Sequence, residues 1–440
     1  MIDQERWLAG VDWASREHQV CLLDPAGQIR GQRAFSHGGA GLAELCEWLL
    51  ATSSRPPAEI AVSIEVSHGP VVDALLERGF EVYATNPKQL DRFRDRLSPA
   101  GLKDDRRDAY VAAHALRTDP QCFRRLSAAD PLIVELRACS RLASELQAER
   151  TRLTNRMREE LWRYYPQALK LTDDLASDWF LAFWLAAPTP QKARRLRPTT
   201  LQQLFQQHHV RRLTAEHALS LLRQPDLTVA PGVVKAACVH LRSLINRLRL
   251  LNRQLRATHA ELDELCNQLA QPQDDSPGQL NEPRDATILR SLPGVGRINL
   301  ATLLAEAHEP LSRRDYQALR ALAGVAPVTR RSGRHILVLR RFACNPRLRD
   351  ALYYWAQAAA RHEPAWRNRY THMRRRGHSH ARALRAIGDR LLAIACAMLR
   401  TATLYDPNRH TNKNGEDALA SSPSNSQAVI GSPACTAPAA

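Results

Sequence analysis

The chain has 440 residues, more than one hydrophobic core usually serves, so two or three domains are expected. Lysine and arginine number 62 against 45 aspartate and glutamate residues, and the resulting formal charge of +17 favours a polyanionic partner. The N-terminus lacks a signal-peptide pattern and no apolar run approaches the roughly 18 residues of a membrane span, so we expect a cytoplasmic protein with no membrane partner. The nine cysteines are scattered and form no Cys-x-x-Cys pair, so we expect no disulfide framework.

The first part of the chain predicts alternating strands and helices. The expected strands are residues 7–12, 18–23, 29–35, 59–65 and 80–84, and the expected helices are residues 41–50 and 71–78. The last two strands flank a helix, which is the order of a parallel crossover unit. Three antiparallel strands followed by such a unit suggest an RNase H-like α/β sheet.

From about residue 130 to about residue 269, strand signals end and apolar residues recur at helical spacing. The clearest series steps by threes and fours, as a coiled-coil seam does. It consists of Leu241, Leu244, Leu248, Leu251, Leu255, Leu262, Leu265 and Leu269. We therefore expect two long helices, paired within one chain or between subunits.

A polar stretch with three prolines, residues 271–285, predicts a linker. A third, mostly helical region follows to about residue 405. Residues 406–440 are rich in serine, asparagine, proline and alanine, with little to bury, and predict a disordered tail.

Four acidic residues of the first region could converge. Asp12 ends the first strand, Glu65 ends the fourth, and Asp105 and Asp108 are three residues apart, which places both on one face of a helix. Each close pair of carboxylates costs about 4 kcal/mol near a protein surface, so such a cluster needs cations, and hard oxygen ligands favour Mg²⁺ or Mn²⁺. Two such ions support cleavage of a phosphodiester. The alternative is a turn residue, a strand-end charge and a solvated helix start.

The string Leu292-Pro293-Gly294-Val295-Gly296 resembles a helix-hairpin-helix element. Gly294 and Gly296 would let backbone N–H groups approach a phosphate of DNA at a helix N-terminus. The alternative is an ordinary connection between two helices.

Further on, Ser332 stands before a glycine among Arg330, Arg331 and Arg334. The arginines could hold a phosphate beside the hydroxyl, and a serine that attacks phosphorus forms a covalent protein–DNA intermediate. A Ser-Gly pair in a basic loop is also compatible with a simple turn.

Taken together, several of these strings resemble the DEDD transposases of the insertion-sequence-110 and -1111 group. The matching strings are Gly10-Val11-Asp12, Ser63-Ile64-Glu65, Asn86-Pro87, Lys103 to Ala109, Leu292 to Gly296 and Gly324 to Gly333. They occur in collinear order over residues 7–125 and 285–400.

The resemblance implies a RuvC-like catalytic domain at residues 1–125, a coiled-coil region at 126–270, the linker at 271–285, and a C-terminal transposase domain at 286–405. It implies that Asp12, Glu65, Asp105 and Asp108 hold the metal and that Ser332 becomes joined to DNA. The family usually has Lys-Thr-Asp where this chain has Lys103-Asp104-Asp105, so Asp104 competes with Asp105 for the third position.

The resemblance further implies dimers or tetramers in which the acidic site of one subunit meets the serine of another. Element ends and target DNA are the implied substrates, a bridge RNA the implied guide, and the bacterial cytosol or nucleoid the implied location. Two rivals remain: a RuvC-like nuclease that uses metal-activated water, and a non-catalytic nucleic-acid-binding protein.

Overall fold

A computed structural model of the chain describes residues 5–97, 104–126, 130–271, 284–332 and 335–407. The chain divides into two compact units, Met1–Asp130 and Pro131–Ala440. Most of the predicted linker and nearly all of the predicted tail lie outside the described residues.

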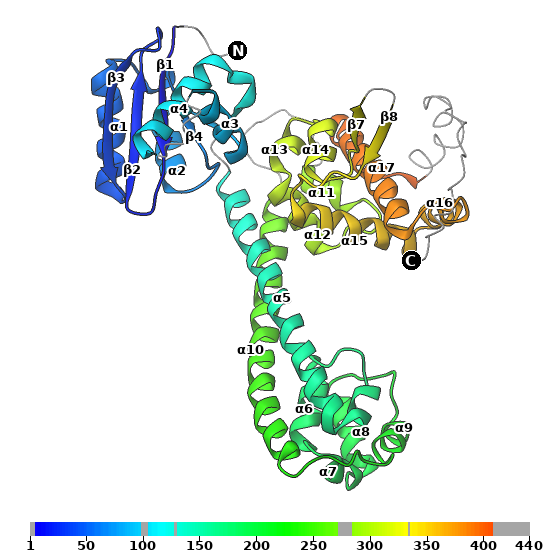
Figure 1. Ribbon diagram of the computed structural model, residues 1–440. Coiled ribbons are helices and arrows are strands. Elements are labelled where there is room, and N and C mark those ends of the chain that lie inside the picture. The colour runs from blue at the N-terminus through cyan, green and yellow to red at the C-terminus, as the bar shows by residue number, and fades with distance from the viewer. Residues whose placement is uncertain (1–4, 98–103, 127–129, 272–283, 333–334, 408–440) are drawn as a thin grey trace, which may run out of the picture. The chain divides into compact units, whose positions relative to one another are not determined.

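A mixed sheet of six strands forms the centre of the first unit, in the order β3-β2-β1-β4-β5-β6 (Figure 1). Strands β1, β2 and β3 pair antiparallel, β4 and β5 continue the sheet parallel to β1, and β6 returns antiparallel to β5. The strands are β1 (Trp7–Asp12), β2 (Glu17–Leu23), β3 (Ile29–Ser36), β4 (Ile60–Ile64), β5 (Glu81–Ala84) and β6 (Arg124–Arg125). The predicted α/β architecture, with three antiparallel strands followed by a parallel crossover, is confirmed.

Helices cover both faces of this sheet. They are α1 (Gly39–Ser53), α2 (Pro70–Glu77), α3 (Pro87–Leu97) and α4 (Asp105–Thr118), with single 3₁₀ turns at Pro57–Glu59 and Pro120–Cys122. Because side chains alternate along a strand, Val11 packs with α1 and α2 on one face, whereas Leu8 packs with α4 on the other. Strand β4 is buried along its whole length for this reason.

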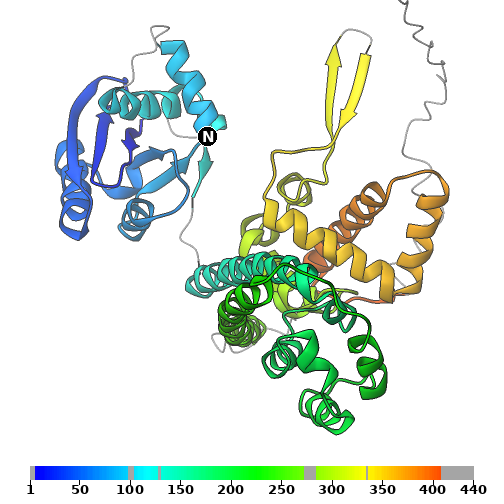
Figure 2. The same ribbon diagram turned by 60° about the horizontal axis from the view of Figure 1, so that its bottom comes forward.

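The second unit contains two long helices, α5 (Pro131–Tyr164) and α10 (Val233–Gln268), which lie side by side (Figures 1 and 2). They run antiparallel, since Glu160 near the end of α5 contacts His240 near the start of α10, and Cys139 contacts Thr258. The leucines of the predicted seam are buried in α10 from Leu241 to Leu265. The two long helices are therefore paired within one chain.

Each end of this helix pair belongs to a different hydrophobic core. At one end a core of 27 buried residues joins α5 and α10 to a group of short helices. These are the 3₁₀ segment Pro166–Lys170, α6 (Asp178–Ala186), α7 (Pro190–Arg194), α8 (Pro198–Gln207) and α9 (Ala215–Leu222). The leucine pattern did not predict these helices.

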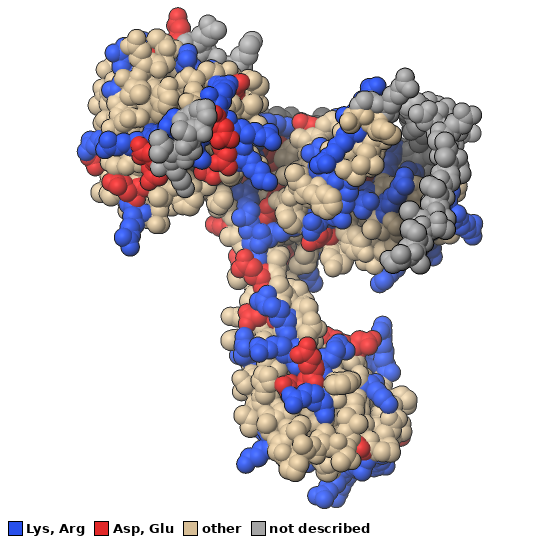
Figure 3. Space-filling model, in the orientation of Figure 1, with Lys and Arg blue, Asp and Glu red and all other residues tan. Residues whose placement is uncertain are grey.

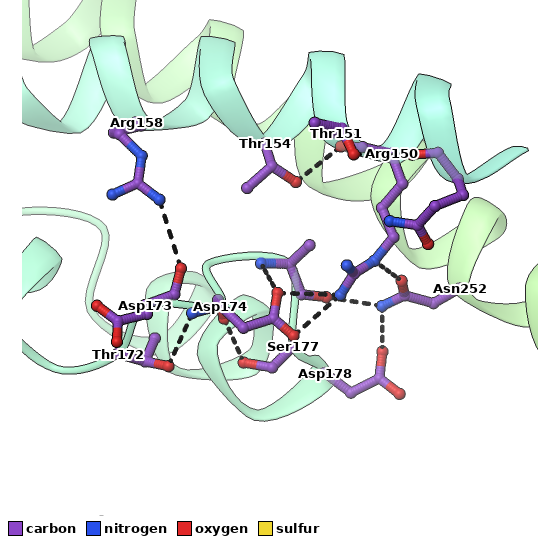
Figure 4. Close-up of polar contacts among 12 residues, drawn as sticks. Arg150, Thr151, Thr154, Arg158, Thr172, Asp173, Asp174, Ser177, Asp178 and Asn252 are labelled. Atoms are coloured by element: carbon purple, nitrogen blue, oxygen red, sulfur yellow. Dashed lines mark hydrogen bonds and ion pairs between the residues drawn. The ribbon is translucent and has the colours of Figure 1, made fainter. Parts of the chain in front are cut away.

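A polar junction ties the pair to the loop before α6 (Figure 4). Asn252 of α10 is 8% exposed and its amide donates to the carbonyl of Ala176 and to Asp178, both at 2.8 Å. The same amide accepts from Arg150 Nε at 3.0 Å, and Arg150 also binds the carboxylate of Asp174. A buried amide satisfied from two other segments fixes how those segments align.

At the other end, the start of α5 and the end of α10 pack on the C-terminal helices. These are α11 (Asp285–Arg290), α12 (Arg297–Glu306), α13 (His308–Ser312), α14 (Tyr316–Leu322), α15 (Pro346–His362), α16 (Pro364–Arg375) and α17 (His380–Thr401). Arg141 of α5 makes a two-pronged ion pair with Glu306. Burial alone would raise the pKa of Glu306, but the hydrogen bonds and charge of Arg141 outweigh it, so this pKa lies below its ordinary value.

The mostly helical C-terminal region includes one element that the sequence did not predict. A two-stranded hairpin, β7 (Val328–Ser332) and β8 (His335–Leu339), projects from the helices (Figure 2). None of the helices among the described residues has the length and apolar character to cross a membrane.

Candidate active site

Asp12 and Glu65 lie next to each other along one edge of the first unit's sheet. Val11 pairs with Ile64 in the parallel register of β1 and β4, so the next residues of both strands, Asp12 and Glu65, are neighbours. Both Val11 and Ile64 pack on the α1 and α2 side, and alternation along β1 therefore directs Asp12 to the face that α4 covers, while Glu65 follows directly after the end of β4. Two of the four predicted acids thus share one edge.

Helix α4 brings its N-terminal turn to that edge. A Cβ added to Gly10 would stand 2.0 Å from the carbonyl oxygen of Ala109, so the strand and helix backbones touch where β1 has no side chain. At its other end, Arg117 of α4 packs on Gly27 in the turn between β2 and β3, near the start of β1. The helix therefore runs opposite to β1, and Asp105 and Asp108 in its first turn face the end of β1 that carries Asp12.

Asp108 is already bound by a cation of the protein. Its side chain is 5% exposed, and Arg94 of α3 donates to it from Nε at 2.6 Å and from Nη2 at 2.9 Å. Arg94 also contacts Asp91 at 2.9 Å. Burial alone would lower the pKa of the Arg94 guanidinium, but Asp108 and Asp91 outweigh it and the pKa lies above its ordinary value. The guanidinium therefore engages both carboxylate oxygens of Asp108.

Asp104 and Asp105 have different surroundings although they are adjacent. Asp104 is the N-cap of α4, and its carboxylate accepts from the backbone N–H of Arg106 at 3.3 Å. Asp105 lies in the first turn with an exposed side chain. Capping stabilises the helix start, so Asp104 has a structural role that Asp105 lacks.

The donor set fits a hard cation, since it contains carboxylates and neither thiolate nor imidazole. Within the described ranges, however, no three His, Cys, Asp or Glu side chains stand together as a group that could hold a metal ion. The expected convergence of four carboxylates is therefore reached only in part. Asp12 and Glu65 adjoin, Asp105 is the first residue of α4, and Asp108 is bound by Arg94.

Ser332 ends β7 with an exposed side chain. Arg330 and Arg331 are exposed on the same strand, while Gly333 and Arg334 lie outside the described residues. In the register of the hairpin Ser332 stands opposite His335, the first residue of β8. The sequence pattern did not single out this histidine, although the Ser-x-x-His spacing was an available signal.

The two glycines of the Leu-Pro-Gly-Val-Gly string have different surroundings. Gly294 has a φ of 78°, and an added Cβ would stand 2.6 Å from the backbone nitrogen of Ala359, so this glycine serves close packing on α15. Trp355 of α15 donates to the carbonyl of Pro293 at 2.9 Å, which holds the same loop. Gly296 is the exposed N-cap of α12 with open space around its Cα. Only Gly296 is placed as a phosphate contact requires.

On the face of the C-terminal helices and hairpin that Figure 3 presents, basic side chains are spread among uncharged ones, with few acidic side chains. On the hairpin itself the sequence from Val328 to Leu339 contains no Asp or Glu.

Comparison with known proteins identifies the family. The DEDD transposase model matches residues 9–166, and the model of the IS116/IS110/IS902 transposase family matches residues 286–371. The mini-circle protein for IS117 of Streptomyces coelicolor, named as a transposase, is 33% identical over 408 residues, which cover 91% of this chain and 95% of that protein.

The chain belongs to the IS110/IS116 family of transposases. The y4uE protein of Sinorhizobium fredii, also named as a transposase, is 57% identical over 216 residues, which are 49% of this chain and 60% of that relative. An insertion element IS110 protein of Streptomyces coelicolor is 30% identical over 315 residues, covering 70% and 74% of the two chains. The resemblance that the acidic and glycine-containing strings indicated is confirmed. The first family match of this transposase contains Asp12, Glu65, Asp105 and Asp108, and the second contains Ser332.

Proposed function

We propose that this transposase cuts and rejoins DNA by a serine nucleophile that acts together with a metal-binding acidic site. The observation that carries the proposal is the parallel register of β1 and β4, which brings Asp12, at the end of β1, beside Glu65, which directly follows β4. The strand order is compatible with the RNase H-like, RuvC-like fold expected for residues 1–125. Residues 286–405 are the proposed transposase domain, and the region 126–270 between them is the proposed coiled coil.

Asp12, Glu65, Asp105 and Asp108 are the proposed ligands of Mg²⁺ or Mn²⁺. Divalent cations bound there would stabilise negative charge on the attacked phosphodiester and on its leaving oxygen. We assign the third position to Asp105, because capping of α4 engages Asp104. For Asp108 to serve, the guanidinium of Arg94 has to move off its carboxylate.

Ser332 is the proposed nucleophile, with Arg330, Arg331 and Arg334 as phosphate contacts and Gly296, next to Gly294, at a backbone contact. Attack by the hydroxyl oxygen breaks one P–O bond and forms a phosphoserine link to DNA, which conserves the bond energy for rejoining. Arginine suits this position because its planar fork donates two parallel hydrogen bonds to one phosphate.

Two further parts of the proposal concern partners. The formal charge of +17 accommodates DNA together with a structured bridge RNA, and we infer that such an RNA selects donor and target. Homo-oligomers, dimers or tetramers, would bring the acids of one subunit to the serine of another.

The test is denaturing electrophoresis of purified protein with labelled element-end DNA, Mg²⁺ and RNA from the element's flanks. Wild type is compared with Ser332→Ala and Asp105→Asn, and Asp104→Asn serves as the matched neighbour. A protein-linked DNA band that is lost in Ser332→Ala and Asp105→Asn but kept in Asp104→Asn supports the proposal.

Two other results would contradict the proposed mechanism and favour a different one. Free cut ends that persist in Ser332→Ala would make the protein a nuclease that uses water. Binding without cleavage, unchanged by Asp12→Asn, would make it a non-catalytic nucleic-acid-binding protein. Omission or nuclease digestion of the RNA tests guidance separately, because unchanged strand transfer without RNA contradicts only that part.

A further inference from the structure

The end of the β7–β8 hairpin places a histidine beside the proposed nucleophile. Ser332 and His335 are directly opposite in an antiparallel ladder. Side chains of opposite residues project from the same face, with Cβ atoms about 4.5–5.5 Å apart. Both side chains are exposed and only two residues separate them in the chain, so the hydroxyl and the imidazole are within reach of each other at the end of the ladder.

The register also sorts the arginines of the hairpin. Arg330 pairs with Leu337, two residues along from Ser332 and His335, and therefore shares their face. Arg331 pairs with Ile336 and projects from the opposite face. One face thus carries a hydroxyl, an imidazole and a guanidinium, and the other carries a guanidinium without either partner.

We propose that His335 is the general base that activates Ser332 and that Arg330 binds the attacked phosphate on the same face. The inference rests on the proposed function, in which Ser332 attacks DNA. A serine hydroxyl is a weak nucleophile until an adjacent base accepts its proton, and histidine is the side chain most often used. No other base is available on the hairpin, because residues 328–339 include no carboxylate.

The step balances within these groups. The imidazole of His335 takes the proton of Ser332 Oγ as that oxygen forms its bond to phosphorus. The P–O bond to the leaving deoxyribose oxygen breaks with its electron pair, and the leaving oxygen takes up a proton from solvent or from the imidazolium. When the strand is rejoined, the same steps run in reverse, and His335 returns the proton to Ser332.

The test measures the initial rate of covalent adduct formation by the full-length protein with element-end DNA, Mg²⁺ and RNA, between pH 5.5 and 8.5. The charged group that faces His335 from the paired strand is Arg330. The wild-type rate is expected to rise with pH. His335→Ala and His335→Gln are expected to lower it on the order of 10²- to 10⁴-fold and to flatten the rise.

Three further readouts separate a base from a structural residue. Added imidazole is expected to restore part of the rate of His335→Ala. Binding of DNA in a mobility-shift assay is expected to stay within about twofold of wild type in both His335 variants. Substrate with sulfur at the leaving position, which needs no protonation, is expected to leave the defect in place because a base acts before departure. Ile336→Ala, on the opposite face, is the matched control and is expected to keep the wild-type pH profile.

An adduct formed by His335→Gln at the wild-type rate and with the wild-type pH profile would overturn the inference, while loss of the adduct in Ser332→Ala would leave the proposed function standing. Full rescue of His335→Ala by the sulfur substrate would make His335 an acid instead of a base. Cleavage that survives Ser332→Ala would remove nucleophile and base together.

Discussion

The guanidinium of Arg94 joins a buried carboxylate to an exposed one. It is held by Asp108, 5% exposed, and by Asp91, 61% exposed. A cation bound by a carboxylate competes with any other cation for the same oxygens, so Arg94 and a divalent metal are alternatives at Asp108.

Replacement of Arg94 by alanine is expected to have opposite effects with and without metal. Without metal the buried carboxylate of Asp108 loses its partner, and the free energy of unfolding should fall by on the order of 3 kcal/mol. With Mn²⁺ the site should bind more tightly than wild type, by about tenfold, and recover part of that loss. Urea denaturation with EDTA or Mn²⁺, together with a Mn²⁺ titration, measures both quantities.

Asp91→Ala is the control, because it removes an exposed partner of Arg94 and should cost under about 1 kcal/mol. Unchanged affinity for Mn²⁺ in Arg94→Ala would show that Asp108 is no metal ligand.

His18 on β2 is fully buried and bonded in a way that suits only its neutral form. Its Nδ1 accepts from the backbone N–H of Ala14 at 3.4 Å, and its Nε2 stands 3.0 Å from Nδ1 of His37. Burial, and then the charge of His37, lower the pKa of His18 below the ordinary 6.5. The folded state therefore binds fewer protons than the unfolded state just below pH 6.5.

The contribution of His18 to stability is complete above about pH 6.5 and is lost as the pH falls below that value towards the pKa of the folded state. The wild type should lose stability between pH 7.5 and 5.5, and His18→Gln should show a shallower loss, although a less stable protein at pH 7.5. Thermal unfolding at a series of pH values checks this. Equal slopes for the two proteins would assign the pH dependence to other groups.

At the scale of elements, the position of α4 on β1 depends on the missing side chain of Gly10. Gly10→Ala places a methyl group 2.0 Å from the carbonyl of Ala109 and 2.6 Å from the nitrogen of Ala113, both backbone atoms. The helix has to shift, at a cost of about 1–3 kcal/mol, and Asp105 and Asp108 shift with it.

Gly10→Ala is therefore expected to weaken Mn²⁺ binding and adduct formation by more than its loss of stability explains. Gly39→Ala, at the start of α1 with nothing near its added Cβ, is the matched control and should leave both unchanged. Mn²⁺ titration and circular dichroism of the two variants give the comparison. Wild-type metal affinity in a folded Gly10→Ala protein would mean that α4 does not position the acids.

Local periodicity accounts for the elements that the sequence predicted. Alternation placed the strand that ends in Asp12 and the strand that ends one residue before Glu65, and the leucine steps from Leu241 to Leu265 placed α10. The β7–β8 hairpin was missed because its apolar residues do not alternate with polar ones. Ile336, Leu337 and Val338 follow one another and are 60%, 56% and 63% exposed.

The parts of the site that sequence could not predict depend on packing between distant segments. Arg94 reaches Asp108 across 14 residues because α3 folds back on α4, and nothing in the spacing of the two residues indicates it. The sequence could place acidic residues at the ends of elements, but it could not predict which carboxylate would form an ion pair with an arginine. Whether the four acids and Ser332 perform the proposed roles stays a prediction.

At the scale of the whole molecule, the proposed acids and the proposed nucleophile belong to different compact units, Met1–Asp130 and Pro131–Ala440. A site built from two units can be completed within one subunit or between two. Mixing full-length Asp12→Asn with full-length Ser332→Ala distinguishes these cases, because each protein alone lacks one half of the chemistry.

If the acids and the serine of one site come from different subunits, each mixed dimer contains one complete site. Random exchange of subunits should then restore about a quarter of the wild-type sites. Strand-exchange assays of the mixture, with each variant alone as control, report the recovery. A mixture as inactive as its components would place both halves in one subunit.

Because α5 and α10 pair antiparallel, residues 131–271 form a helical insertion whose first and last parts pack in the same hydrophobic core. Whole helical turns removed in equal number from both helices would carry α6 to α9 closer to that core without altering the C-terminal helices or the first unit. The two family matches leave residues 167–285 unmatched. The length of the α5–α10 pair therefore sets how far α6 to α9 stand from the C-terminal helices, and whole helical turns are the unit in which that distance can be changed.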